Sequence, residues 1–192
     1  MDPPVNEKDF SKMSKKEAEK VFEWYTKEIP HRLSLLKKAY LLCDGNTDIF
    51  DYSSDSLKPL WSWYLKNVKI VLINEDKRQK IQEQIDNYPT HIRAECLVPE
   101  NKIEAVWVQI AFDIGIYMSL CLMKAKKNLD WGIVFEPQNL YSVNRPVIVG
   151  FAKKNIHFDS MNIMTTLMHQ IIKSKASCEK MYDYFMSWAV KP

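Results

Sequence analysis

The most constraining feature of this sequence is a long apolar segment between about Glu100 and Lys126. Its large apolar side chains recur at helical spacing along one broad face, and further apolar residues make much of the remaining surface apolar too. A helix that is apolar nearly all round is buried against several neighbours in a folded protein. We therefore predict that this segment is the central helix of the fold.

The same segment is not expected to span a membrane. Its most apolar part, from Val106 to Met123, contains Gln109 and Asp113, whereas a membrane-spanning helix needs about 20 predominantly apolar residues. The polar stretch from Met1 to Phe10 lacks the apolar core of a secretory signal. The four cysteines lie far apart, and nothing in their spacing points to an oxidising compartment. We predict no membrane association and a cytoplasmic location.

Other segments also repeat apolar residues at helical spacing. Ser14 and Glu17 have the spacing of a capping box, which begins a helix that runs to Cys43. Pro30 is expected to kink or split this helix, because it lacks an amide donor. An apolar stripe from Leu57 to Leu65 predicts a second helix. Further helices are expected at 75–85, 160–173 and 178–190.

The periodicity of the sequence changes after the central helix. Short β-branched and aromatic runs at 131–135 and 143–151 predict two antiparallel strands joined by a loop at 136–142. Pro146 favours an edge strand or the start of a strand. Because two strands alone are marginally stable, the hairpin must pack on helices or gain a third strand. The β-branched segment 69–73 is a candidate for that strand.

Together these patterns predict an α+β fold that is mostly helical. We expect a single domain of about six helices with a small two- or three-stranded antiparallel sheet around residues 131–151. A chain of 192 residues is only slightly longer than one typical domain. We therefore expect a flexible N-terminal arm at 1–13 and one domain over 14–192.

Composition and spacing argue against several classes of function. Only four glycines occur, which is few for a chain with a phosphate-binding loop. The net charge of +3 comes from scattered lysines and arginines rather than from the dense basic stripe of a nucleic-acid-binding protein. No two of the four histidines have metal-ligand spacing on a helix, and no signature of a catalytic nucleophile is present. We expect no metal, no cofactor and no nucleic-acid partner.

Asp113 is the most informative polar residue. It follows Val106 and Ile110 on the apolar face of the central helix, so its side chain is expected to point inward. A buried carboxylate without partners costs several kcal/mol, so it must be paired, hydrogen-bonded or protonated. Tyr117 lies one turn later on the same face, and Asn144 or Arg145 could supply the remaining donors. These residues either form a polar pocket at the junction of helix and hairpin or form a network that fixes the hairpin on the helix.

Aromatic residues lie on more than one face of the predicted helices. Trp24 and Trp63 are examples, and they are candidates for an exposed interface, because aromatic side chains are enriched where proteins bind one another. The alternative is that these large rings cover the core from several sides.

Several short motifs are spread along the chain. They contain Ser53, Ser56, Leu57, Pro59, Leu60, Trp61 and Trp63, the segment Asp113–Tyr117, the pair Trp131 and Gly132, and residues of the segment Asn144–Phe151. These motifs resemble those of a group of small bacterial cytoplasmic proteins with no assigned activity. The likeness covers roughly 14–172, and it implies a bacterial origin and a single domain. Members of this group are similar in size and style to immunity or accessory proteins.

Two functions follow from these observations. The first is a non-enzymatic protein of the bacterial cytoplasm that binds another protein, of immunity or regulatory type. The alternative is a small enzyme or ligand-binding domain with a polar pocket around Asp113, Tyr117, Asn144 and Arg145. A deep pocket with a strongly perturbed Asp113 favours the alternative, whereas a contiguous exposed patch favours the first.

Overall fold

The computed structural model describes residues 4–5, 9–43, 48–93, 96–137, 140–153 and 155–191. Within these ranges it contains six helices of ten or more residues and two small antiparallel sheets of two strands each, so the prediction of a mostly helical α+β fold is confirmed. The helices are α1 (Lys15–Cys43), α2 (Leu57–Asn67), α3 (Glu75–Asp86), the four-residue α4 (Thr90–Arg93), α5 (Ala105–Ala125), α6 (Ser160–Ile172) and α7 (Lys180–Ala189). The strands are β1 (Ile70–Leu72), β2 (Asn101–Ile103), β3 (Asp130–Ile133) and β4 (Pro146–Val149).

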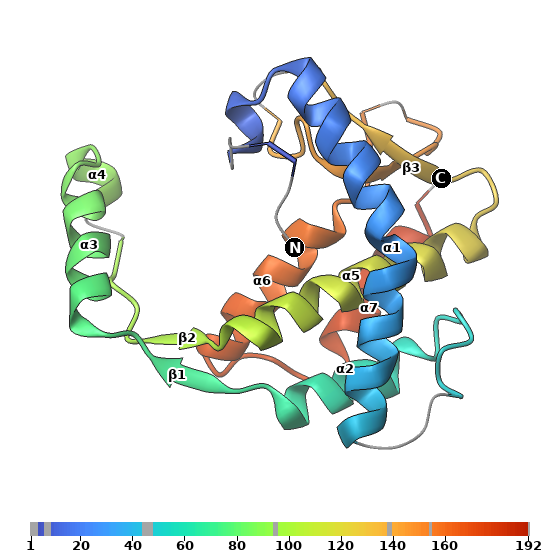
Figure 1. The fold of residues 1–192 in the computed structure, drawn as a ribbon, viewed down its shortest axis with the longest axis horizontal. Coiled ribbons are helices and arrows are strands. Elements are labelled where there is room, and N and C mark those ends of the chain that lie inside the picture. Colours follow the sequence, from blue (N-terminus) through green and yellow to red (C-terminus); the bar gives the residue numbers. More distant parts are fainter. Residues whose placement is uncertain are drawn as a thin grey trace.

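The helix α5 is the centre of the fold, as its sequence predicts. It crosses the middle of the molecule, and α1, α6 and α7 lie around it (Figure 1). Its length and composition would allow it to cross a membrane, but 61% of its most apolar 18-residue stretch is buried inside the protein. The main hydrophobic core contains residues of α1, α2, α5, α6 and α7, and so the burial of α5 holds these helices together.

The start of α5 differs from the prediction. Residues 101–103 form strand β2, which pairs antiparallel with β1, so the helix begins at Ala105 instead of about Glu100. The segment 69–73, which was a candidate for a third strand of the later hairpin, does not join that hairpin, because its central residues are β1 and pair with β2. Local β-branched composition identified the strand, but its partner strand is Asn101–Ile103, beyond α3 and α4 in the chain.

The hairpin of β3 and β4 forms as predicted. The two strands pair antiparallel, with Trp131 opposite Ile148, and Pro146 is the first residue of β4. A strand start is a place where the missing amide of proline is tolerated. Ile148 also forms a single antiparallel bridge with Phe158 on its other side. The hairpin packs on α1, so its stability comes from a helix instead of a third strand.

The first helix begins where the sequence predicts. The amide of Ser14 donates to the Glu17 carboxylate at 2.9 Å, and the amide of Glu17 donates to Ser14 Oγ at 3.3 Å, which is the reciprocal pattern of a capping box. The helix is not split at Pro30 but runs on to Cys43. Ile29 and Leu33 are both buried on either side of the proline, and this packing offsets the lost backbone bond.

The N-terminal segment 1–13, which was predicted to be flexible, contains a folded turn. Phe10–Lys12 is a 3₁₀ turn, and Met13 is buried against Ala18 and Val21 of α1. The last helix, α7, begins at Lys180, two residues later than the sequence suggested.

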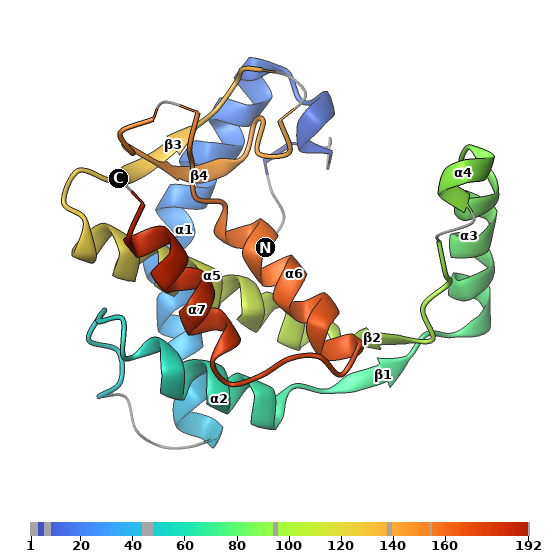
Figure 2. The same ribbon diagram turned by 180° about the vertical axis from the view of Figure 1, so that it is seen from behind.

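The helices α3 and α4 stand apart from the rest of the molecule. They are joined to it by the ribbon of β1 and β2, and both views show them projecting to one side (Figures 1 and 2). We call residues 70–103 the arm. The helix α3 is charged or polar at most positions, which suits a helix that contributes a single buried residue, Ile85.

Gly150, which follows β4, provides a test of the fold. Its φ of +101° is rarely adopted by residues with a side chain, and a Cβ atom there would lie 2.3 Å from the carbonyl oxygen of Asn128. We expect Gly150→Ala to lower the free energy of unfolding by at least about 2 kcal/mol, from backbone strain and overpacking together. Urea denaturation followed by circular dichroism measures this change. Ala152→Ser, at a nearby exposed position, serves as the control, and equal stability of the two variants would contradict the expectation.

Candidate functional site

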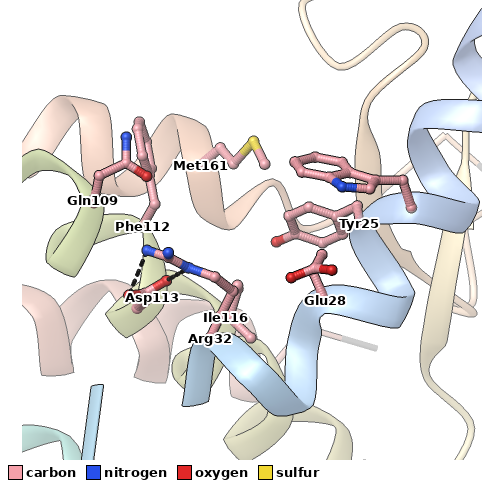
Figure 3. Close-up of a pocket in the computed structure, with 9 residues that line it drawn as sticks. Tyr25, Glu28, Arg32, Gln109, Phe112, Asp113, Ile116 and Met161 are labelled. Atoms are coloured by element: carbon pink, nitrogen blue, oxygen red, sulfur yellow. Dashed lines mark hydrogen bonds and ion pairs between the residues drawn. The ribbon is translucent and has the colours of Figure 1, made fainter. Parts of the chain in front are cut away.

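The buried carboxylate of Asp113 is paired with Arg32. Asp113, on α5, is only 3% exposed, as the periodicity of the helix predicts. Arg32 lies on α1, and its Nε donates to Oδ1 at 2.7 Å while its Nη2 donates to Oδ2 at 2.8 Å (Figure 3). Both carboxylate oxygens are thus held by one guanidinium in the two-pronged geometry that arginine favours. The pair joins α1 to the central helix.

Burial perturbs this carboxyl strongly. Desolvation raises the pKa of Asp113 from 3.8 to about 6, although the hydrogen bonds and the charge of Arg32 act in the opposite direction. His31, also on α1, adds a smaller opposing effect on this pKa. Above pH 6 the pair is therefore a true ion pair, whereas below pH 6 the carboxyl takes up a proton and the charge of Arg32 is left unmatched.

A pocket lies beside this ion pair, between α1, α5 and α6. Its volume is about 170 Å³, which is similar to the roughly 150 Å³ of an engineered cavity that binds benzene. Its polar lining consists of Glu28, Arg32, Gln109 and Asp113. Its apolar lining consists of Trp24, Tyr25, Phe112, Ile116 and Met161. A small apolar space with a few convergent polar groups is the usual form of a ligand site.

The second carboxylate of the pocket, Glu28, has no such partner. Glu28 lies one helical turn before Arg32 on α1, and Figure 3 shows its carboxylate facing the pocket. Its Oε2 is buried and accepts no hydrogen bond from any residue in the described ranges. A buried carboxylate oxygen without a donor is costly, and such groups are uncommon in folded proteins. Glu28 is therefore the polar group of this pocket that still lacks a hydrogen-bond donor among the described residues.

Aromatic rings form much of the remaining wall. Tyr25 is buried and packs edge-on against Trp131, with the ring centroids 5.3 Å apart. Burial raises the pKa of the Tyr25 phenol above its usual range, so its hydroxyl remains protonated and can act as a donor. Trp24 and Phe112 are each half-buried and contribute their rings to the same space. The pocket thus combines a carboxylate with several aromatic surfaces.

The other residues of the predicted site are not gathered around Asp113. The Tyr117 hydroxyl accepts from the amide of Tyr52 at 2.9 Å and lies 2.8 Å from Ser56 Oγ, so it fixes the loop that precedes α2. Asn144 has a φ of +61°, and its side-chain amide donates to the carbonyl oxygens of Phe10 and Met13. It therefore anchors the N-terminal turn.

Arg145 belongs to a different cluster. Its Nη1 lies 3.7 Å from Asp159 Oδ2, and its guanidinium lies over the rings of Tyr141 and Phe10. Asp159 also caps α6 by accepting from the amide of Asn162. The expectation that Asn144 or Arg145 supplies the donors for Asp113 was therefore wrong, because the hairpin carries these residues toward the N-terminal turn and the start of α6.

The two tryptophans proposed for an interface occupy different surroundings. Trp24 is half-buried and lines the pocket. Trp63 is only 3% exposed and packs among Tyr40 and Trp107 in the main core. Trp63 therefore does not form part of an exposed surface, and of the two only Trp24 remains a candidate for contact with another molecule.

Sequence reasoning missed Glu28 and Arg32. The signal that could have found them is their position on α1, where they are four residues apart and lie beside the buried Ile29 and Leu33. A charged residue next to such core positions is partly buried and needs a partner.

Comparison of the chain with protein-family models, with curated proteins and with solved structures gives no match. The fold and the pocket define the chain as a mostly helical α+β protein with a small, partly aromatic pocket next to a buried ion pair.

The ion pair makes stability depend on pH in a way that can be measured. Because the pKa of Asp113 is raised to about 6 in the folded protein, the folded state holds the carboxyl proton more tightly than the unfolded state does. The stability that this bound proton contributes is fully present below about pH 4 and is lost as the pH rises through 6. Removing the guanidinium raises that pKa further and extends the loss to higher pH. We expect Arg32→Met to lower the free energy of unfolding by about 3 kcal/mol at pH 8, and by less at pH 5.

Urea denaturation at the two pH values measures this difference. Lys38→Met, at an exposed position of the same helix, is the matched control. In the double variant Arg32→Met, Asp113→Asn, the extra loss at pH 8 should disappear, because the carboxylate that Arg32 pairs with has been removed. An Arg32→Met variant with the same deficit at both pH values would show that the carboxylate is not responsible.

Proposed function

We propose that the protein binds a small molecule in the pocket between α1, α5 and α6. The observation that carries this proposal is the unpartnered carboxylate oxygen of Glu28, buried beside a cavity of about 170 Å³ with aromatic walls. A core that only needed to be filled would place an apolar side chain there. A carboxylate without a donor is instead expected where a ligand supplies one.

We propose binding without catalysis. Asp113 is the carboxyl in the pocket with a perturbed pKa, which is the usual mark of an acid or base catalyst. Both of its oxygens, however, are bound to Arg32. A general base needs a free oxygen within hydrogen-bond reach of the substrate, so the pair is better suited to shaping the pocket than to transferring a proton.

We propose also that the protein is bacterial and cytoplasmic. The thiols of all four cysteines are free, which fits the reducing cytoplasm. A bacterial origin is supported by the resemblance of its motifs alone.

Titration with benzyl alcohol tests the proposed pocket. This neutral single-ring compound is close in size to the cavity, and we expect binding with a millimolar Kd, the range for a ligand of so few atoms. The ¹H–¹⁵N spectrum should then show shifts at the indole of Trp24 and at Nε of Arg32. Met161→Trp should abolish these shifts by filling the pocket, whereas Met186→Trp, on the exposed side of α7, should not. If no single-ring compound of this size, whether neutral or charged, changes the wild-type spectrum at millimolar concentration, the proposal is wrong.

A second candidate function, binding of a protein partner, is favoured by the arm. All three residues of β1 are exposed although all are apolar, and Ile70 and Leu72 are 45% and 77% exposed. Within the described residues β1 pairs with β2 alone, so its other edge is open. Open, apolar strand edges are templates for pairing with another chain.

We propose that a second copy of this chain occupies the open edge. Two antiparallel copies of β1, related by a two-fold axis at Val71, would place Ile70 opposite Leu72 and Leu72 opposite Ile70. Size-exclusion chromatography with light scattering should therefore show a concentration-dependent dimer. Ile70→Lys with Leu72→Lys should make the chain monomeric, whereas Leu97→Lys, at an exposed position of the arm outside the strand, should not. A wild-type chain that is monomeric at every concentration contradicts this second candidate.

A further inference from the structure

The charges around the pocket do not balance. Three charged side chains line it, namely Glu28, Arg32 and Asp113. Arg32 commits Nε and Nη2 to the two oxygens of Asp113, so these two charges neutralise one another. Glu28 forms no ion pair in the described part of the chain and has a buried oxygen without a donor. The Glu28 carboxylate is therefore the charged group of this pocket that lacks a counter-charge from the described residues.

The walls of the pocket suit a particular form of positive charge. Trp24, Tyr25 and Phe112 contribute aromatic side chains to the lining of this space, and Figure 3 shows the ring of Tyr25 beside the carboxylate of Glu28. The face of an aromatic ring attracts cations, and the attraction is larger where water is excluded. A carboxylate together with aromatic rings is a combination that binds alkylammonium groups, because the carboxylate supplies the counter-charge and the rings contact the carbon atoms.

The neighbouring ion pair also disfavours other ligand charges. An anionic ligand could approach Arg32 only by competing with Asp113, and it would meet the carboxylate of Glu28 in the same small cavity. Like charges in a poorly hydrated site repel strongly. A neutral ligand would fill the space but leave Glu28 Oε2 without a charged donor.

We infer that the ligand is a small organic cation, an amine whose ammonium group donates to Glu28 and whose apolar body, about the size of one aromatic ring, packs against Trp24, Phe112 and Met161. This inference rests on the proposed small-molecule pocket and adds the chemical class of the ligand.

Three compounds of similar size test the inference. Benzylamine is a cation at neutral pH, benzyl alcohol is neutral and benzoate is an anion. Isothermal titration calorimetry and the spectrum of the Trp24 indole measure their affinities. We expect benzylamine to bind at least about tenfold more tightly than benzyl alcohol, because only the ammonium group adds a positive charge opposite the carboxylate of Glu28. Benzoate should bind most weakly.

A single isosteric substitution identifies the group responsible. Glu28→Gln keeps the shape of the side chain and removes its charge, and we expect it to weaken benzylamine about tenfold or more while changing benzyl alcohol little. Glu23→Gln, at an exposed position of the same helix, should change neither. The circular dichroism spectrum and urea midpoint of each variant show whether it folds as the wild type does.

The possible failures can be told apart. If benzyl alcohol or benzoate binds as tightly as benzylamine, or if Glu28→Gln leaves the preference for benzylamine intact, the ligand is not a cation held by Glu28, and the inference is overturned while the pocket stands. If none of the three compounds binds to a folded wild-type chain, the proposed function fails, and the inference fails with it.

Discussion

The structure depends on the burial of one helix. Most of α5 is enclosed by α1, α6 and α7, so the polar groups on its buried face must find partners inside the protein. Each of these groups does so with a different part of the chain. Asp113 binds Arg32 of α1, Tyr117 binds the loop before α2, and Ser119 donates to the carbonyl oxygen of Gly115 within the helix itself. Asp113 and Tyr117 thus fix the positions of α1 and of the loop before α2 on the central helix.

This requirement explains which parts of the site the sequence could reveal. The inward direction of Asp113 follows from a period of 3.6 residues, and the need for a partner follows from the cost of burying a charge. Both were predicted. The identity of the partner was not, because Arg32 lies 81 residues away and reaches Asp113 only through the rotation of α1 about its own axis against α5. Periodicity indicates which residues of a helix face inward but not which residue of another helix they meet.

The strands show the same limit. The β-branched runs of β1, β3 and β4 were visible in the sequence, and β3 and β4 are close neighbours along the chain, so their pairing was predicted correctly. The strand β1 pairs with residues that appeared to belong to the start of the central helix, and the helices of the arm lie between the two. Short strands of three residues carry too little periodicity to distinguish them from a helix end. Pairing across an intervening pair of helices therefore could not be deduced from local pattern.

The two carboxylates of the pocket, Asp113 and Glu28, differ because Arg32 pairs with Asp113 and leaves Glu28 available to a ligand. Asp113 is held on both oxygens by Arg32, and this pair connects α1 to α5 at the edge of the cavity. Because Arg32 is engaged there, it does not neutralise Glu28, although the two are one turn apart on the same helix and such neighbours often pair. The ion pair that joins α1 to α5 is thus also the reason why Glu28 keeps an unmatched charge. Recognition of a cation would follow from that competition for a single guanidinium, without any residue placed in the pocket for binding alone.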